Sequence, residues 1–180
     1  MQEVTINKAA RLSEHLTSSS VATLGHSNEL DGSRLSPHFT LGEMCKTSAK
    51  TADGNIPSHI HIENLKRLCG WLEMLRSEWN KRYGEGDDPI VINSGYRSEA
   101  VNKAVGGVSG SNHLTGCAAD IRVAGIEQLV RYATILLDIS DESQEDFDEL
   151  LLERSPRGGY WLHFAVRPSG NRRKVRLIQT

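Results

Sequence analysis

Apolar residues recur at helical spacing in two segments of the chain. Across residues 62–79 the apolar side chains fall three or four positions apart, and Gly84 follows as a helix-ending residue. Residues 126–139 show the same spacing, with Leu129, Ala133 and Leu136 on one side. Each segment is therefore predicted to form a helix with one buried side.

Shorter runs rich in β-branched and aromatic residues predict strands. They lie at residues 89–93, 118–123, 147–153, 160–166 and 174–178. The segment Ser155-Pro-Arg-Gly-Gly separates the third run from the fourth and is typical of a hairpin turn. Helices early in the chain, strands clustered late and a hairpin connection favour an α+β fold, with a largely antiparallel sheet flanked by helices.

Polar segments indicate how the chain is organised. Residues 1–36 are poor in large apolar side chains, so we expect a polar leader, disordered or loosely attached, ahead of a folded domain at residues 37–180. Thr40, with Glu43 three residues later, predicts the start of a short helix, and Ser98 predicts the start of another. The acidic stretch at residues 138–148 is expected to be a solvated loop.

Charge and cysteine content narrow the functional classes. A formal net charge of -2 provides no general attraction to nucleic acid or an anionic membrane, and no apolar run is long enough for a membrane helix. The start of the sequence lacks the features of a signal peptide, so we expect a protein that is cytoplasmic as synthesised and reaches the cell wall through lysis or another route of release. The cysteines, Cys45, Cys69 and Cys117, lack CxxC spacing and are expected to be buried or free thiols.

Two histidines have neighbours that suggest a metal site. His113 precedes Asp120 along a segment whose small residues let the backbone pass close to an ion, and His163 lies within the predicted strand 160–166. Two imidazoles and a carboxylate, with one position left open, are typical ligands of catalytic zinc. The spacing also allows an ordinary interpretation, because strand histidines are often hydrogen-bonded core residues and aspartates often form caps or turns.

A family resemblance bears on this choice. The run Ser111-x-His113-x-x-Gly116-x-Ala118-x-Asp120 resembles the signature of the zinc D-alanyl-D-alanine carboxypeptidases and the related vancomycin-resistance D,D-dipeptidases. Those enzymes share a fold with the Hedgehog signalling domain, so the resemblance implies a Hedgehog/DD-peptidase-like fold here.

Further motifs follow the same family in the same order. The segment that begins at Phe39 (FTLGEM) and the segment Asn93–Asn102, with its SGYRS run, resemble the family's early motifs. Phe147–Glu153 and Trp161-Leu-His163 resemble its closing hairpin. The likeness extends over roughly residues 38–166 and is greatest to the phage and bacteroidal carboxypeptidase-like branch.

The resemblance implies roles for individual residues. His113, Asp120 and His163 would hold a Zn2+ ion, and Arg97 would steady a substrate carboxylate or the developing oxyanion, a role that suits its planar guanidinium. Without the resemblance, Arg97 would be assigned to a surface salt bridge at a helix start. Ser111 either hydrogen-bonds near the metal loop or only forms a turn.

The general base departs from the family pattern. Many relatives carry an acidic residue three positions before the last histidine, where this chain has Tyr160, which cannot replace a carboxylate at neutral pH. Glu153 is the substitute we predict, because it would share a face with His163 if it lies opposite Trp161 across the hairpin. Glu149 lies four positions from Glu153, so its side chain would point to the same face of the strand, and it is the reserve candidate. Alternatively, Glu153 is only a charged residue at the end of a hairpin.

The resemblance implies a zinc metallopeptidase that acts on peptidoglycan stem peptides, most directly as a D-Ala-D-Ala carboxypeptidase. A peptidoglycan endopeptidase of the phage-lysin type is the near alternative, which the missing signal peptide favours. An alternative from a different functional class is a non-catalytic, zinc-containing binding module. Tyr160 and the basic tail at residues 167–176 suggest it, although such a tail is more often a solvated strand edge. We expect a monomer that binds a peptidoglycan stem peptide and neither nucleic acid nor membrane.

Overall fold

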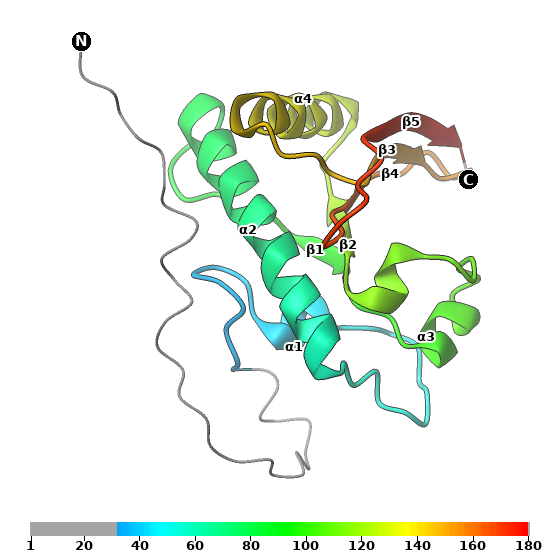
Figure 1. Cartoon of the computed structure of the whole chain (residues 1–180). Helices are drawn as coiled ribbons and strands as arrows, with labels where there is room; N and C mark the ends of the chain where they lie inside the picture. Colours follow the sequence, from blue (N-terminus) through cyan, green and yellow to red (C-terminus); the bar gives the residue numbers. More distant parts are fainter. Residues whose placement is uncertain (1–31, 180) are drawn as a thin grey trace, which may run out of the picture.

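The computed structural model describes residues 32–179 and packs helices against one five-stranded sheet (Figure 1). The helical elements are α1 (Leu41–Met44), α2 (His59–Arg82), α3 (Glu99–Ala104), the 3-10 helix η1 (Asn112–Thr115) and α4 (Ile126–Ser143). The strands are β1 (Ile92–Ser94), β2 (Ala118–Arg122), β4 (Tyr160–Ala165), β3 (Glu149–Arg154) and β5 (Lys174–Gln179). The predicted α+β class is confirmed.

Both long helices form where the apolar spacing predicts them. α2 starts three residues earlier and ends three residues later than the apolar run, with Ser58 as its N-cap. α4 continues to Ser143, so the prediction of a solvated loop over residues 138–148 is wrong for its first half, which adds helical turns to α4. The predicted caps hold, since the side chain of Thr40 accepts a hydrogen bond from the Glu43 amide and that of Ser98 from the Val101 amide.

The sheet has the strand order β1-β2-β4-β3-β5, and every neighbouring pair is antiparallel except β3 and β5. The predicted hairpin joins β3 to β4, where the Ser155 amide donates to the Gly159 carbonyl at 2.8 Å. β1 begins at Ile92, later than the predicted run 89–93, and its pairing with β2 is irregular between Ile92 and Ser94. The largely antiparallel sheet is thus confirmed.

One face of the sheet is buried under the two long helices. α4 packs on β3 and β4, and α2 packs on α4 and β2 (Figure 1). Leu150, Leu162 and Phe164 point into this layer and are fully buried, and the Trp71 ring of α2 lies 5.5 Å from the Phe164 ring. Because side chains alternate along a strand, the intervening residues of β2, β3 and β4 face the other way, where within residues 32–179 neither α2 nor α4 covers them.

Three expectations about the chain as a whole have different outcomes. Most of the predicted leader lies outside the described residues, so the boundary at residues 36 and 37 stays a prediction. Cys45, Cys69 and Cys117 are free thiols, and the last two are buried, as expected. No helix within residues 32–179 combines the length and the apolar character needed to cross a membrane.

Candidate metal centre

Three elements bring the predicted metal ligands together on the face of the sheet that the long helices leave uncovered. His113 lies in η1, Asp120 in β2 and His163 in β4, and the ladder sets Asp120 directly opposite His163. η1 ends at Gly116, whose φ of 72° turns the chain into β2. A side chain there would also meet the His61 carbonyl oxygen, 2.7 Å from an added Cβ. Glycine therefore permits the close approach that delivers both His113 and Asp120.

The ligand atoms converge. One nitrogen or oxygen from each of His113, Asp120 and His163 lies within 4.8 Å of the others. His113 Nδ1 lies 2.7 Å from the Gly95 carbonyl oxygen, so Nδ1 carries the proton and Nε2 is free to face Asp120 Oδ1 at 3.3 Å. His163 presents Nδ1 to the same oxygen at 3.0 Å. Two imidazole nitrogens and one carboxylate oxygen around a single point fit a zinc ion well.

The electrostatics of the cluster follow from its burial. Burial alone would lower the pKa of His163, but the carboxylates of Asp120 and Glu149 outweigh it and raise that pKa to about 9. Burial also works to raise the pKa of Asp120, yet His113 and His163 hold it well below its ordinary value. The cluster thus keeps Asp120 as an anion, which is the form that binds a cation.

Arg97 lies beside the centre and is bound to it. Its backbone amide donates to the His113 carbonyl at 3.1 Å, its Nε donates to Ser94 Oγ at 2.8 Å, and its guanidinium pairs with Asp120. The side chain is mostly buried. The salt bridge expected for Arg97 in the absence of a family therefore exists, but its partner is a candidate metal ligand and not a surface group.

The two candidate bases occupy the same face of β3 in different surroundings. Glu153 lies opposite Trp161, and Leu151 lies opposite His163, so the predicted register holds. Burial raises the pKa of Glu153, as does the charge of Asp120, while His163 and Arg97 partly offset the rise. A raised pKa brings a carboxylate nearer to that of a working general base at neutral pH.

Glu149 has the opposite environment. Its carboxylate accepts from Lys174 Nζ at 2.8 Å and from Asn112 Nδ2 at 3.0 Å, and it lies 3.6 Å from His163 Nε2. His163 and Lys174 lower its pKa, against the effect of burial. This carboxylate is already engaged by cations and donors, which makes it a poor proton acceptor.

Two further predicted residues have modest roles. The Ser111 hydroxyl accepts a hydrogen bond from the His113 amide at 3.3 Å, so Ser111 caps η1 and steadies the metal loop from outside. Tyr160 has the opposite parity from His163 along β4 and packs against the apolar core. It therefore faces away from the centre.

Sequence reasoning missed Asn112, Asp148 and Gly95. The Asn112 amide bridges Asp148 and Glu149, and the Gly95 carbonyl orients His113. A side chain at position 95 would collide with the Met44 carbonyl oxygen, 2.3 Å from an added Cβ. The glycine of the SGYRS run was the available signal for Gly95, whereas nothing local distinguishes Asn112.

Acidic partners neutralise most of the positive charge of the basic tail at residues 167–176. One of these partners, Asp148, belongs to the stretch that was predicted to be a solvated loop. Asp148 is completely buried, which contradicts that prediction. Arg172 contacts it with two hydrogen bonds of 2.7 Å, and Arg167 lies 3.0 Å away, which satisfies a carboxylate that burial would otherwise penalise. Arg173 pairs with Asp141 and Asp146, and both Arg172 and Lys174 pair with Glu149.

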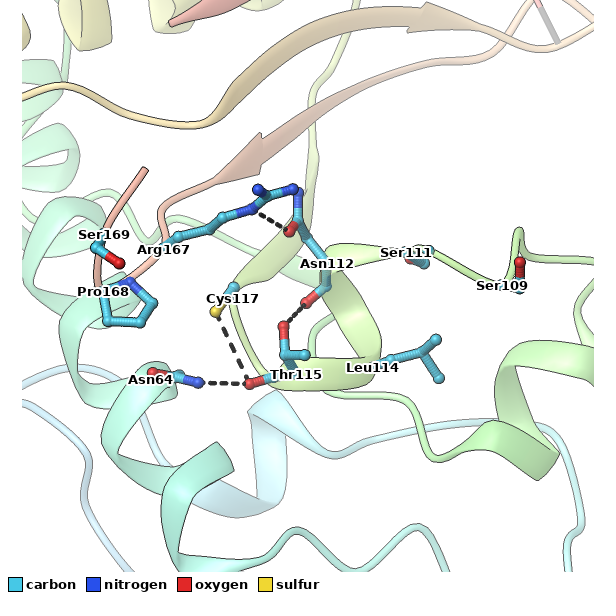
Figure 2. Close-up of a pocket in the computed structure, with 11 residues that line it drawn as sticks. Asn64, Ser109, Ser111, Asn112, Leu114, Thr115, Cys117, Arg167, Pro168 and Ser169 are labelled. Carbon is cyan, nitrogen blue, oxygen red and sulfur yellow. Dashed lines mark hydrogen bonds between the residues drawn. The ribbon is translucent and has the colours of Figure 1, made fainter. Parts of the chain in front are cut away.

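A separate pocket of about 370 Å³ lies beside η1 (Figure 2). Figure 2 shows the Arg167 side chain reaching Asn112 on one wall, with Asn64 and Thr115 on another. None of the three candidate ligands lines it. Arg167 is the one charged side chain that lines this pocket, and the other lining residues are polar, small or apolar. The candidate functional centre is therefore the ligand cluster on the sheet.

Comparison with known proteins agrees with the motifs. A family model described as Peptidase M15 matches residues 37–138. A zinc D-Ala-D-Ala carboxypeptidase of Streptomyces albus G is 31% identical over 84 residues, which are 47% of this chain and 31% of that protein. The chain thus spans about a third of the length of this relative.

The family match includes His113 and Asp120 but ends before β3, so Glu153 and His163 rest on the geometry of the sheet. The match extends over more than half of the 180 residues, and the α+β fold with its open, mostly antiparallel sheet agrees with a DD-peptidase-like architecture. The chain therefore belongs to the peptidase M15 family.

Proposed function

We propose that this chain is a zinc metallopeptidase that hydrolyses peptidoglycan stem peptides, as a D,D-carboxypeptidase acting on D-Ala-D-Ala termini. The observation that carries the proposal is the convergence of one ligand atom each from His113, Asp120 and His163 within 4.8 Å, on the face of the sheet opposite α2 and α4. His113 Nε2 and His163 Nδ1 lie 3.3 Å and 3.0 Å from Asp120 Oδ1. Membership of the peptidase M15 family supports a metallopeptidase, and the Streptomyces relative motivates zinc and the bond.

His113, Asp120 and His163 would hold the ion. When bound, zinc supplies Lewis-acid chemistry, lowering the pKa of water and polarising a carbonyl group. Asp120 contributes the one negative charge of the ligand set, and the Gly95 carbonyl keeps the His113 ring in the tautomer that presents Nε2.

Glu153 is the general base of the proposal. Its carboxylate takes a proton from the attacking water as the new C–O bond forms, and then delivers that proton to the amine nitrogen as the peptide C–N bond breaks. The support is its register opposite Trp161, on the face of His163, and the pKa that burial raises. No covalent acyl-enzyme is needed, because Cys117 is buried and burial raises its pKa.

Arg97 stabilises negative charge on the substrate. The contacts with Ser94 and Asp120 hold its guanidinium rigid, so little side-chain entropy is lost when a substrate oxygen binds to it. A planar cation fixed at the edge of the centre suits either the carboxylate terminus of the peptide or the oxyanion that forms at the scissile carbonyl.

The test is release of D-alanine from a pentapeptide stem by zinc-loaded protein, beside a chelator-treated sample and Glu153→Gln. We expect chelator-sensitive release that collapses in Glu153→Gln while zinc remains bound. Cleavage elsewhere in the stem or cross-bridge would replace the carboxypeptidase by an endopeptidase. Stoichiometric zinc without hydrolysis of any peptidoglycan fragment would favour the non-catalytic binding module and overturn the proposal.

A further inference from the structure

The two ring nitrogens of His163 face two different carboxylates. Nδ1 lies 3.0 Å from Asp120 Oδ1 and points into the ligand cluster, while Nε2 lies 3.6 Å from Glu149 Oε2 on the other side of the ring. The Nε2 separation is within ion-pair range and slightly beyond a direct hydrogen bond, so a shift of a few tenths of an ångström by either group would close it. The histidine side chain is 9% exposed and its surroundings therefore determine its tautomer.

Glu149 is held in a fixed orientation by groups on three elements. Its Oε1 accepts from Lys174 Nζ at 2.8 Å and pairs with Arg172 at 3.0 Å, and its Oε2 accepts from Asn112 Nδ2 at 3.0 Å. The cations occupy one oxygen and leave the other directed at Asn112 and His163. This arrangement leaves Oε2 available as a hydrogen-bond acceptor toward His163.

The same contacts reach the other end of the metal centre. Asn112 immediately precedes His113 in η1, and its Nδ2 donates to Asp148 Oδ2 at 2.8 Å as well as to Glu149. Arg172 joins both carboxylates from the segment ahead of β5. A single network thus ties the loop of one candidate ligand to the strand that faces the other.

The geometry points to Glu149 as the positioning residue of the metal centre: it accepts a hydrogen bond from the Nε2–H group of His163 and so presents the Nδ1 lone pair to the ion. The inference rests on the proposed zinc site and assigns to Glu149 a role distinct from that of the general base. A neutral imidazole carries one proton, so binding a metal through Nδ1 requires that proton to sit on Nε2. A carboxylate at Nε2 fixes this tautomer and makes Nδ1 a better donor to the metal.

The experiment measures zinc affinity by competition with a chromophoric chelator, for the full chain and for Glu149→Gln. Loss of an outer partner of a metal-bound histidine weakens metal affinity by about 10- to 100-fold, and we expect a loss in this range. The control is Glu127→Gln, which removes the same charge from an exposed side chain of α4 that pairs with Arg131, and should leave zinc affinity close to that of the parent. The d–d absorption of the Co2+-loaded protein should shift in Glu149→Gln and not in Glu127→Gln.

A second variant guards against misfolding. Glu149→Asp keeps a negative charge among Lys174, Arg172 and Asn112 but withdraws the carboxylate from Nε2 by about one carbon–carbon bond, so it should fold and still bind zinc more weakly. Thermal unfolding of the metal-free proteins verifies that each variant is folded. Parent-like zinc affinity and Co2+ spectra in both Glu149 variants would overturn the inference. Affinity is measured without substrate, so a parent protein that binds zinc but cleaves no peptide would defeat only the proposed function.

Discussion

Alternate residues of β4 have opposite environments. Leu162 and Phe164 lie under the helices and are fully buried among apolar side chains, whereas Trp161 and His163 point to the other face, where His163 meets Asp120 and Glu149. The two faces are separated by the thickness of a single strand, yet one contributes mainly to stability and the other contains nearly all of the candidate chemistry.

The two faces of the sheet need different kinds of support. Apolar side chains on the helix-covered face need only volume and close contact, which many combinations of leucine and phenylalanine can supply. Polar groups on the site face need specific partners, because a buried charge or imidazole without a partner is costly. The site face is accordingly bordered by a network of Asn112, Asp148, Glu149, Arg172 and Lys174.

The largest effect should come from His163→Ala. The substitution removes one of three metal ligands, and loss of the ion removes several kcal/mol of transition-state stabilisation, on the order of 10⁴-fold in rate. Zinc stoichiometry by atomic absorption and peptide hydrolysis should fall together. Retained zinc with retained hydrolysis would show that the site face does not hold the catalytic centre.

Glu153→Gln should reduce kcat by about 10²- to 10³-fold, because the variant lacks the proton acceptor and keeps the metal ligands. In the parent protein, burial raises the Glu153 pKa, so hydrolysis should decline as the pH falls through that raised pKa and the carboxylate becomes protonated. The pH–rate profile and zinc content of both proteins test this. Full activity in Glu153→Gln, with Glu149→Gln inactive despite bound zinc, would exchange the roles of the two glutamates.

Phe164→Ala tests the opposite face of the same strand. The Phe164 ring lies 5.5 Å from that of Trp71 and 5.7 Å from that of Phe147, and its removal should cost about 3–5 kcal/mol of unfolding free energy through lost burial and a cavity. Urea denaturation measures the loss. The folded fraction should still bind zinc like the parent, and a specific loss of affinity there would show that the two faces are coupled.

Asp148→Asn should have the smallest effect, about 1–3 kcal/mol, because it leaves Arg172 and Arg167 without a buried carboxylate partner. Burial acts to raise the pKa of Asp148, but Arg172 and Asn112 prevail and lower it below its ordinary 3.8. A depressed native pKa gives stability that is present above about pH 4 and lost as the pH falls through the native pKa. The unfolding temperature should therefore fall more steeply between pH 7 and pH 2 in the parent than in the variant.

Several parts of the molecule could be predicted from sequence. The spacing of apolar residues placed α2 and α4, and Ser155-Pro-Arg-Gly-Gly predicted the hairpin between β3 and β4. Its register, with Glu153 opposite Trp161, was a condition of the prediction that the structure meets. The acidic stretch was misjudged, since residues up to Ser143 join α4 and Asp148 is buried. Local composition favours solvent for such a stretch, and only partners distant in sequence, such as Arg172, make the burial of Asp148 tolerable.

The sequence shows which residues alternate between core and site along each strand, because a period of two is a local property of the chain. It also singled out His113, Asp120 and His163 as the residues able to bind a metal together. Which glutamate is held by cations depends on the tertiary structure. Glu149 and Glu153 have the same parity and the same chemistry, and they differ because Lys174, Arg172 and Asn112, all distant along the chain, reach only Glu149.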